Sequence, residues 1–512
     1  MNKLIIVFIA LCCFNTSLWS ESITDSLTYK VEMQSAISNN NTPLWLNANR
    51  YGVSSLDKSN GYLRAAAIRN LSYDRESKFD LGYGLDMIAP YNYTSNVVVQ
   101  QAFVEGRWLH GVLSIGSKEY PMQLKNNRLS SGSQTLGINA RPVPQVRLAL
   151  PEYYTLPFLN RWLHLKGHIA FGKTTDDNWQ EDFTNKTTKY TSGTLYHSKA
   201  GYLKIGKDEA PFSVELGLEM GSIFGGDAYR PNSDGTMEKI SSGRGFKAFW
   251  NALIPGGSDA TEETYKNAEG DQLGSWVIRA NYQNDDIELG VYWDHFFEDH
   301  SGMFFLDYNG YGQGDEWNVK KDHKYLLYDL KDMMLGAELR FKHKSFIQGI
   351  VFEYIYTKYQ SGAMFHDHTQ SIPDHIGGMD EYYNHSIFTG WQHWGQVMGN
   401  PLFRSPIYNE DGTINVDNNR FYAFHLGVDG RPSDVVAWRL LCTVQKGFGT
   451  YHKPYADPHT SFSMMAETEI TPQNRNLKGW NLKLAYGMDM GKIYGHNYGG
   501  MITLSKTGLL NL

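Results

Sequence analysis

The sequence has few cysteines and, beyond its first residues, no long apolar run. Only three of its 512 residues are cysteine, and Cys12 and Cys13 lie in an N-terminal apolar stretch. Cys442 is left alone in the remainder, which argues against a secreted fold held together by disulfides. Because no run of about 18 apolar residues follows the N-terminus, the sequence predicts no membrane-spanning helix.

A basic block and an acidic tail are also missing. The net charge is −7, so we expect no nucleic-acid partner. The sequence contains no nucleophile elbow, P-loop or zinc-protease helix motif. We therefore assign no catalytic residue, no metal and no cofactor, and we expect a protein that is not an enzyme.

The N-terminus has the features of a secretory signal. Lys3 precedes the apolar stretch Leu4–Phe14, which is too short to span a membrane, and Ser20 is a small residue suited to cleavage. This pattern predicts a signal peptide at residues 1–20. Residues 21–512 contain no internal repeat and no low-complexity linker, and we interpret them as one domain.

Aromatic residues and glycine are abundant, with 33 Tyr, 25 Phe, 13 Trp and 50 Gly. Apolar and polar residues alternate over many segments of about 9 to 13 residues, the length of a tilted membrane-crossing strand. Examples are Phe212–Met220, Trp276–Tyr282, Ala337–Phe341 and Leu482–Met488. The polar face of these segments carries charges of both signs: Glu215, Arg279, Glu338, Arg340, Arg439, Glu467 and Lys483. The pattern predicts an all-β fold, an antiparallel transmembrane β-barrel of roughly 16–18 strands with short helices in connections or as a plug.

The connections between these segments alternate in length. Short connections, which we expect on the periplasmic side, are Tyr73–Lys78, Gln283–Asp286 and Lys342–Ser345. Long connections, which we expect to face outward, are Pro121–Gln145, Lys173–Leu195, Ser222–Gln272, Phe297–Leu326, Gly362–Tyr382, Trp391–Phe421 and Gly449–Ser461. Helical spacing over Phe246–Ile254 predicts a short helix within one of them.

The most unusual stretch is Tyr382–Leu402, YYNHSIFTGWQHWGQVMGNPL. We expect it to leave a strand at the outer membrane boundary and to enter an external loop. Aromatic faces stack on sugar rings, and amides and imidazoles bond to hydroxyls. The candidate polysaccharide-binding residues are Tyr382, Asn384, Trp391, His393, Trp394 and Asn400, with Tyr451 and Tyr455 as outer members. The alternative is a girdle of aromatics at the membrane boundary, or a packed loop.

Three other groups allow more than one interpretation. Asp294–His300 is either a catalytic or metal-binding cluster or a charged strand end. Arg141, followed by Pro142, lies either in a loop folded into the barrel as a constriction or in an ordinary external loop. A histidine-rich loop that contains His366, His368 and His375 is either a weak metal site or a solvated surface.

Several of these segments, taken in order, resemble one known family. They are GINARPVPQVRLALPEYY (Gly137–Tyr154), DHFFEDHSGM (Asp294–Met303), Tyr382–Leu402 and NNRFYAFHLG (Asn418–Gly427). Together they resemble the capsule assembly Wzi family, in the form found in Bacteroidetes-type Gram-negative bacteria. The resemblance implies an outer-membrane barrel of about 18 strands, a helical plug at its periplasmic end, and a lectin-like role in holding capsular polysaccharide.

The sequence therefore predicts an outer-membrane attachment protein whose partners are capsular or exported polysaccharide and outer-membrane lipid. Many weak sites on many copies would hold a repeating polymer firmly. The sequence does not indicate an oligomeric state. One alternative is a general or sugar-selective porin. The other is an outer-membrane hydrolase that uses Asp294, His295 or Glu298.

Overall fold

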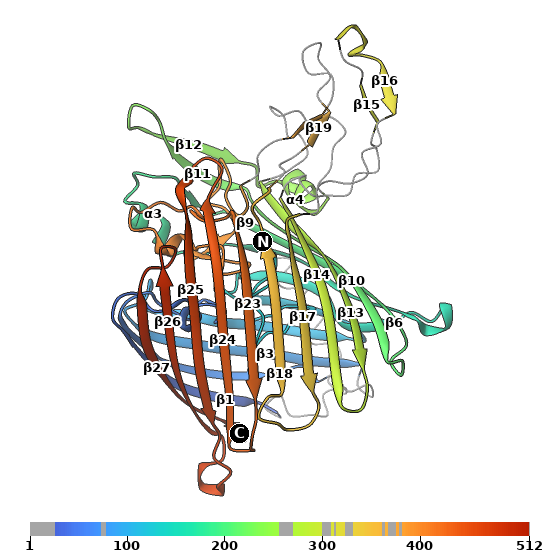
Figure 1. The fold of residues 1–512 in the computed structure, drawn as a ribbon, viewed down its shortest axis with the longest axis vertical. Helices are drawn as coiled ribbons and strands as arrows, with labels where there is room; N and C mark the ends of the chain where they lie inside the picture. Colours follow the sequence, from blue (N-terminus) through green and yellow to red (C-terminus); the bar gives the residue numbers. More distant parts are fainter. Residues whose placement is uncertain are drawn as a thin grey trace, which may run out of the picture.

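A computed structural model describes residues 26–72, 78–254, 270–298, 309–311, 314–322, 331–360, 364–366, 375–377 and 381–510. Eighteen antiparallel strands form one sheet, in which β1 pairs with β2 on one side and with β27 on the other, so the sheet closes into a barrel (Figure 1). The fold class and the strand number are as predicted. The predicted signal, residues 1–20, lies outside the described residues.

The barrel strands are β1 (Thr28–Ser38), β2 (Ser59–Arg69), β3 (Phe79–Tyr91), β4 (Val98–Trp108), β5 (Gly111–Ser117), β6 (Gln145–Thr155), β7 (Leu163–Lys173), β9 (Leu195–Ile205), β10 (Phe212–Phe224), β13 (Asp271–Gln283), β14 (Ile287–Glu298), β17 (Met333–Phe341), β18 (Gly349–Tyr356), β23 (Phe421–Gly430), β24 (Val436–Gly449), β25 (Pro454–Ile470), β26 (Trp480–Gly491) and β27 (Asn497–Leu509). Consecutive members of this series pair throughout, as in an up-and-down barrel.

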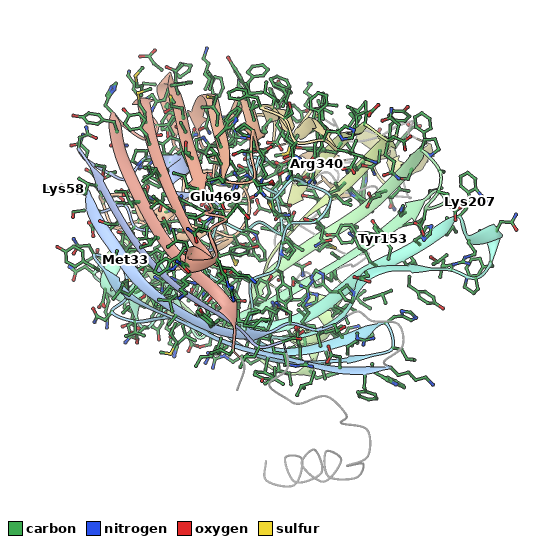
Figure 2. The ribbon with its side chains drawn as sticks, turned by 90° about the horizontal axis from the view of Figure 1, so that it is seen from below. Met33, Lys58, Tyr153, Lys207, Arg340 and Glu469 are labelled. Atoms are coloured by element: carbon green, nitrogen blue, oxygen red, sulfur yellow. The ribbon has the colours of Figure 1, made fainter. Side chains whose placement is uncertain are left out.

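Strand alternation separates an apolar outer face from a polar inner face. In the β10–β13 pair, Leu216 lies opposite Ile278, and both side chains are about two-fifths exposed on the outside. One residue along, Glu215 lies opposite Arg279 on the inner face. Met33 is likewise exposed on the outer wall, whereas Glu469 comes from the inner face (Figure 2). Successive side chains of a strand point to opposite faces, so each strand supplies both surfaces.

An apolar band follows from this alternation around the outer wall. Its members, which are between 48% and 68% exposed, include Met33, Ile37, Leu63, Val104, Leu148, Val291, Phe352, Val444 and Ile502. A contiguous exposed apolar surface of this kind is costly in water and matches the hydrocarbon region of a membrane. Among the described residues, no helix is both long enough and apolar enough to cross a bilayer.

The two ends of the barrel differ in the length of their connections. Residues 109–110, 206–211, 284–286, 342–348 and 431–435 form short turns at one end, which is the lower end in Figure 1. At the opposite end, long connections join β5 to β6, β7 to β9, β10 to β13 and β18 to β23. The predicted asymmetry in length is confirmed for the described connections, with one correction; most of Tyr73–Lys78, Phe297–Leu326 and Gly362–Tyr382 lies outside the described residues. The expected long connection Gly449–Ser461 is only residues 450–453, because β25 begins at Pro454 and continues for 17 residues.

Smaller elements lie in the connections between the barrel strands, most of them toward the long-connection end; the 3-10 turns at residues 159–161 and 475–477 lie at the short-turn end. The short strands are β8 (Tyr190–Ser192), β11 (Gly226–Pro231), β12 (Met237–Ser242), β15 (Asn309–Tyr311), β16 (Lys320–Asp322), β19 (Met364–His366), β20 (His375–Gly377), β21 (Gln392–His393) and β22 (Gln396–Val397). The α-helices are α2 (Leu44–Asn47), α3 (Trp179–Thr184) and α4 (Phe246–Leu253), and the 3-10 turns are η1 (Leu159–Arg161), η2 (Gly314–Glu316), η3 (Pro406–Tyr408) and η4 (Arg475–Leu477). Helix α4 confirms the helix expected over Phe246–Ile254.

Three segments enter the barrel and fill its bore: residues 39–58, 118–144 and 381–420. We call them the plug. Their apolar side chains, such as Trp45, Leu129 and Phe403, form one buried cluster with inward side chains of the wall, such as Phe296 and Val351. The plug is built mostly from irregular chain, and its helices are the four-residue α2 and the short turn η3. It enters from the long-connection end. The family resemblance implied a helical plug, and this is corrected, because the described plug segments are mostly irregular.

Candidate functional site

The stretch Tyr382–Leu402 lies inside the bore as part of the plug. Tyr382, Trp391, His393 and Asn400 are each 3% exposed or less. The expectation that this stretch leaves a strand at the outer membrane boundary and enters an external loop is wrong, because its side chains are buried in the bore. Its rings and amides contact the chain itself in this structure.

The hydrogen bonds of this stretch explain its burial. Trp391 donates from Nε1 to the carbonyl oxygen of Thr135 at 2.8 Å. Asn400 donates from Nδ2 to the carbonyl oxygen of Gly132 at 3.0 Å. Both bonds join two plug segments that are far apart in sequence. Buried polar groups need such partners, since an unpaired one costs about 1–3 kcal/mol.

His393 bonds through both ring nitrogens. Nδ1 lies 2.8 Å from the carbonyl oxygen of Arg141, so it donates, and Nε2 accepts from the backbone N–H of Thr175 at 3.1 Å. A neutral imidazole has one donor and one acceptor, and this pair of bonds uses both. Burial lowers the pKa of His393 to about 4, so the ring is neutral at pH 7.

The remaining candidates of the stretch are nearer its surface. Asn384 is half-buried and forms a two-way bond with the backbone of Val416, at 3.0 Å from its Nδ2 and at 2.8 Å to its Oδ1. Trp394 is half-buried, and the guanidinium of Arg141 lies 4.2 Å from the centre of its ring. Arg141 is thus held inside the bore, which confirms the interpretation of its loop as folded into the barrel.

Tyr451 and Tyr455 occupy a different place, at the mouth of the bore. The guanidinium of Arg420 lies 3.8 Å from the ring centre of Tyr451, and the Tyr451 hydroxyl donates to the carbonyl oxygen of Tyr359. Tyr455 stacks on His459 with ring centres 3.9 Å apart. Both tyrosines are half-buried. They are the two predicted residues, of eight, that lie outside the plug, and each presents part of a ring to solvent.

The acidic cluster at Asp294–His300 divides between the two faces of β14. Asp294 points inward and forms an ion pair with Lys125 of the plug, with both side chains fully buried. His295 lies opposite Trp276 on the outer face, and Glu298 accepts from the backbone N–H of Tyr383 at 3.0 Å. Neighbouring strand residues point to opposite faces, so Asp294 and His295 do not share a site. Asp299 and His300 lie outside the described residues, as do the side chains of His366, His368 and His375.

Several wall residues that hold the plug were not singled out from the sequence. Glu353 accepts from the hydroxyl of Ser130 at 2.6 Å and from the backbone N–H of Ser131 at 2.8 Å. Glu219 accepts from the hydroxyl of Ser133 at 3.0 Å. Burial by itself would lower the pKa of Lys125. The nearby carboxylates of Asp294, Glu219 and Glu353 have the opposite and larger effect, so the pKa of Lys125 lies above its usual value. One sequence signal was available: Tyr382–Leu402 contains no Asp, Glu, Lys or Arg, which is typical of a buried segment.

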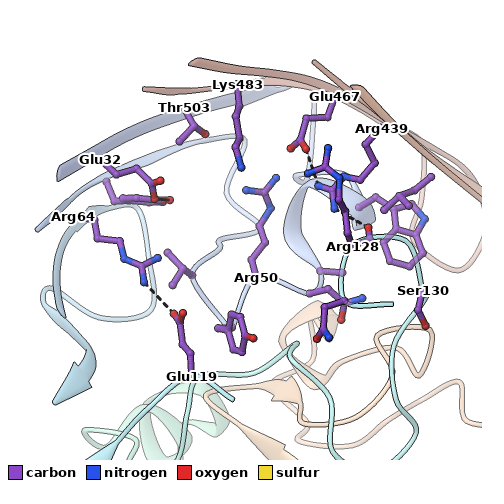
Figure 3. A pocket seen from close by; sticks show the side chains of 18 residues that line it. Glu32, Arg50, Arg64, Glu119, Arg128, Ser130, Arg439, Glu467, Lys483 and Thr503 are labelled. Carbon is purple, nitrogen blue, oxygen red and sulfur yellow. Dashed lines mark hydrogen bonds and ion pairs between the residues drawn. The ribbon is translucent and has the colours of Figure 1, made fainter. Parts of the chain in front are cut away.

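A cavity of about 220 Å³ remains between the plug and the wall. It lies toward the short-turn end, since its wall residues Arg439 and Lys483 are three residues from the starts of β24 and β26. Figure 3 shows the guanidinium of Arg50, from the plug, between Lys483 and Glu467. The charged lining side chains are Arg50, Arg64, Arg128, Arg439 and Lys483 against Glu32, Glu119 and Glu467. This excess of cations suits water or a small anion.

Comparison with known proteins supports the fold of this chain and does not identify its family. No family model matches the chain, and no curated protein matches it. Among solved structures, the chain is similar to Wzi of Escherichia coli, described as an outer-membrane protein involved in group 1 capsule assembly and as a carbohydrate-binding β-barrel. The TM-score is 0.53 at 11% identity, and the alignment covers 94% of this chain and 85% of that one. This likeness supports an outer-membrane β-barrel.

Two further solved barrels are more distant. OccAB2 of Acinetobacter baumannii has a TM-score of 0.46 at 9% identity, with 95% of this chain and 99% of that chain covered. OccK2 of Pseudomonas aeruginosa, in complex with glucuronate, has a TM-score of 0.45 at 9% identity, with 95% and 98% covered. Likenesses at this level carry no argument about function.

Proposed function

We propose that this protein holds capsular or exported polysaccharide at the surface of the outer membrane, in the manner of the capsule assembly Wzi family and without catalysis. The observation that carries the proposal is the filled bore. Fully buried ion pairs and hydrogen bonds, such as Lys125–Asp294 and Ser130–Glu353, tie the plug to the wall. A barrel braced in this way favours attachment at its mouth over passage through its bore.

The mouth offers the groups that a sugar polymer needs. Tyr451 and Tyr455 are half-buried rings, each next to a cationic or polar neighbour, Arg420 or His459. Aromatic faces accept the C–H face of a sugar ring, and nearby donors bond to its hydroxyls. A single site of this size binds weakly. A repeating polymer contacts many copies at once, so the total attachment is firm.

The test is deletion of the gene, followed by measurement of cell-bound and released polymer. We expect the polymer to appear in the medium at an unchanged rate of synthesis. Restoring the wild-type gene should return it to the cells, and a Tyr451→Ala/Tyr455→Ala variant should return less. Unchanged cell-bound polymer after deletion would contradict the proposal.

A porin is the second candidate, and the cavity favours it. A space of about 220 Å³ with an excess of cationic side chains would attract small anions that pass through the bore. Conductance in planar bilayers separates the two functions. Large, steady channels at neutral pH would favour a porin, whereas a closed barrel with rare brief openings is expected for the attachment protein.

A further inference from the structure

Polar side chains occupy one patch of the outer wall, where an apolar surface is expected. Lys199 of β9 lies opposite Ile169, which is 45% exposed on the outside, so Lys199 faces outward too. His197, two residues away, is on the same face and lies opposite Ser222 of β10. Ser222 in turn lies opposite Gln272 of β13. Polar groups at such positions are costly against lipid.

Helix α4 covers this patch. Its residues Ala248 and Ala252 are buried, and Phe249 packs on Phe171 of β7 and Phe224 of β10, with ring centres 5.3 and 5.4 Å apart. Under the helix, His197 and Ser222 are 1% exposed and Gln272 is 3% exposed. The helix therefore lies on the outside of the barrel near its long-connection end, as Figure 1 shows at the upper rim.

The wall also satisfies the C-terminus of α4. The amine of Lys199 donates to the carbonyl oxygens of Ala252 and Leu253, and Gln272 donates from Nε2 to the carbonyl oxygen of Asn251 at 3.4 Å. The last carbonyls of a helix have no partner within the helix, and a cation there is favourable. The helix carbonyls thus accept the hydrogen bonds of a lysine that has little access to water, and the lysine in turn satisfies these carbonyls.

The opposite face of α4 is apolar and open. Phe246, Trp250 and Ile254 are spaced four residues apart, so they share one face, and they are 83%, 51% and 53% exposed. The rings of Phe246 and Trp250 stack with centres 6.4 Å apart. Lys247 and Arg244 beside them are exposed. An aromatic stripe flanked by basic residues is the pattern of a helix that lies in a membrane interface.

We propose that α4 is a membrane-interface helix of the outer leaflet, with Phe246, Trp250 and Ile254 inserted among lipid chains. Two observations identify lipid as the occupant. The helix packs on the outer face of β7 and β10, the strands that carry Ile169 and Leu216 of the exposed apolar band. The helix also covers the polar patch, which needs shielding only where the surroundings are apolar. This inference concerns the seating of the barrel in the membrane and is independent of polysaccharide attachment.

Tryptophan quenching in lipid vesicles tests the proposal. The refolded barrel is placed in phosphatidylcholine vesicles with or without bromine on the acyl chains, and the emission of a Trp250→Phe variant is subtracted from that of wild type. We expect the Trp250 emission to lose most of its intensity in brominated lipid and little with aqueous iodide. The same subtraction for Trp108, 64% exposed at the other rim of the wall, provides the lipid-facing reference.

Two outcomes would overturn the proposal. Quenching of Trp250 by iodide and not by brominated lipid would place the helix in water. Quenching by neither would mean that protein covers the stripe, for example a second copy of the chain. The heat-induced gel shift of a folded barrel confirms that each variant has folded.

A second measurement is independent of tryptophan. In a Cys442→Ser background refolded without residues 1–20, a bimane label is attached at Phe246→Cys or, as the matched control, at Lys247→Cys on the same turn. We expect label emission shifted to the blue, as in lipid, at position 246 and less so at position 247. Equal, water-like emission at both positions would contradict the proposal.

Discussion

The stretch Tyr382–Leu402 and the pair Tyr451 and Tyr455 are similar in composition but differ in what their side chains contact. Both contain aromatic rings beside amides, imidazoles or cations. In the bore, Trp391 and Asn400 are almost fully buried, and carbonyl oxygens of another plug segment accept their polar hydrogens. At the mouth, the two tyrosines keep part of each ring exposed. The proposed sugar-binding surface and the hydrogen-bonded core therefore use the same residue types.

The two regions are therefore distinguished by exposed area and not by composition. Each polar atom of Trp391 and His393 has a partner within the chain, so a ligand there would have to displace an existing bond. At the mouth, Tyr451 and Tyr455 also have partners within the chain, Arg420 and His459, but part of each tyrosine stays exposed. Variants in the two regions should therefore differ in kind: bore variants should change stability, and mouth variants should change binding.

The largest expected effect comes from Lys125→Met. This change leaves the carboxylate of Asp294 fully buried without its cation, which costs about 3–5 kcal/mol of stability. Denaturant unfolding of the refolded barrel in detergent micelles measures it. The double variant Lys125→Met/Asp294→Asn should recover part of the loss because no buried charge remains unpaired. Equal stability of the single and double variants would contradict the role given to this ion pair.

A comparable loss is expected from Trp391→Ala. The indole is 1% exposed, stacks on Tyr196 and bonds to Thr135, so its removal leaves a cavity that costs about 3–5 kcal/mol. Hydrogen exchange should show faster exchange in residues 118–144. Polymer-fragment affinity per folded molecule should stay unchanged. A lost affinity with unchanged exchange would instead assign Trp391 to the binding site.

Acid should loosen the plug, by a smaller amount. The pKa of His393 is about 4 in the folded protein and about 6.5 when the ring is free, so the unfolded chain takes up the proton first as the pH falls. Its contribution is present above pH 6.5 and is lost between pH 6.5 and 4, at most about 3 kcal/mol. Unfolding free energies at pH 7 and pH 4.5 measure it. A His393→Gln variant keeps one donor and one acceptor and should lose this part of the pH dependence.

The smallest effects are expected at the mouth. Tyr451→Ala and Tyr455→Ala should each weaken binding of short polymer fragments by about 0.5–1.5 kcal/mol, the range for one aromatic contact. Calorimetric titration measures this, and unfolding should change little. Tyr498→Ala, which removes a 56%-exposed ring from the outer wall, is the matched control and should leave binding intact. If all three variants weakened fragment binding equally, the mouth would not differ from the outer wall in binding.

The wall was predictable from the sequence because alternation is a local signal. Leu216 and Ile278 follow the two-residue period, and the structure places both outside, with Glu215 and Arg279 inside. Helix α4 was predictable for the same reason, from its own spacing. Each of these expectations needed only residues within about a dozen positions.

The plug was not predictable in this way. Its contacts join residues that are far apart, such as Lys125 with Asp294 and Trp391 with Thr135, and no period marks the segments that make them. The length of β25 was missed because its first residues, Pro454–Pro458, include two prolines and an aspartate, which are typical of loops. The absence of charged residues in Tyr382–Leu402 was the one local sign of burial.

The pairing of β1 with β27 has a consequence for assembly. These strands come from the two ends of the described chain, and they pair along almost their whole length, from Thr28 opposite Leu509 to Ser38 opposite Gly499. The ring cannot close until the last strand has been made and exported, which makes its final contacts the most distant in sequence. The plug segments lie between these strands in the chain, and many of their contacts, such as Lys125 with Asp294, are made with the wall that this pairing completes. A substitution that disrupts β27 should therefore leave the sheet unclosed, with the plug accessible to protease.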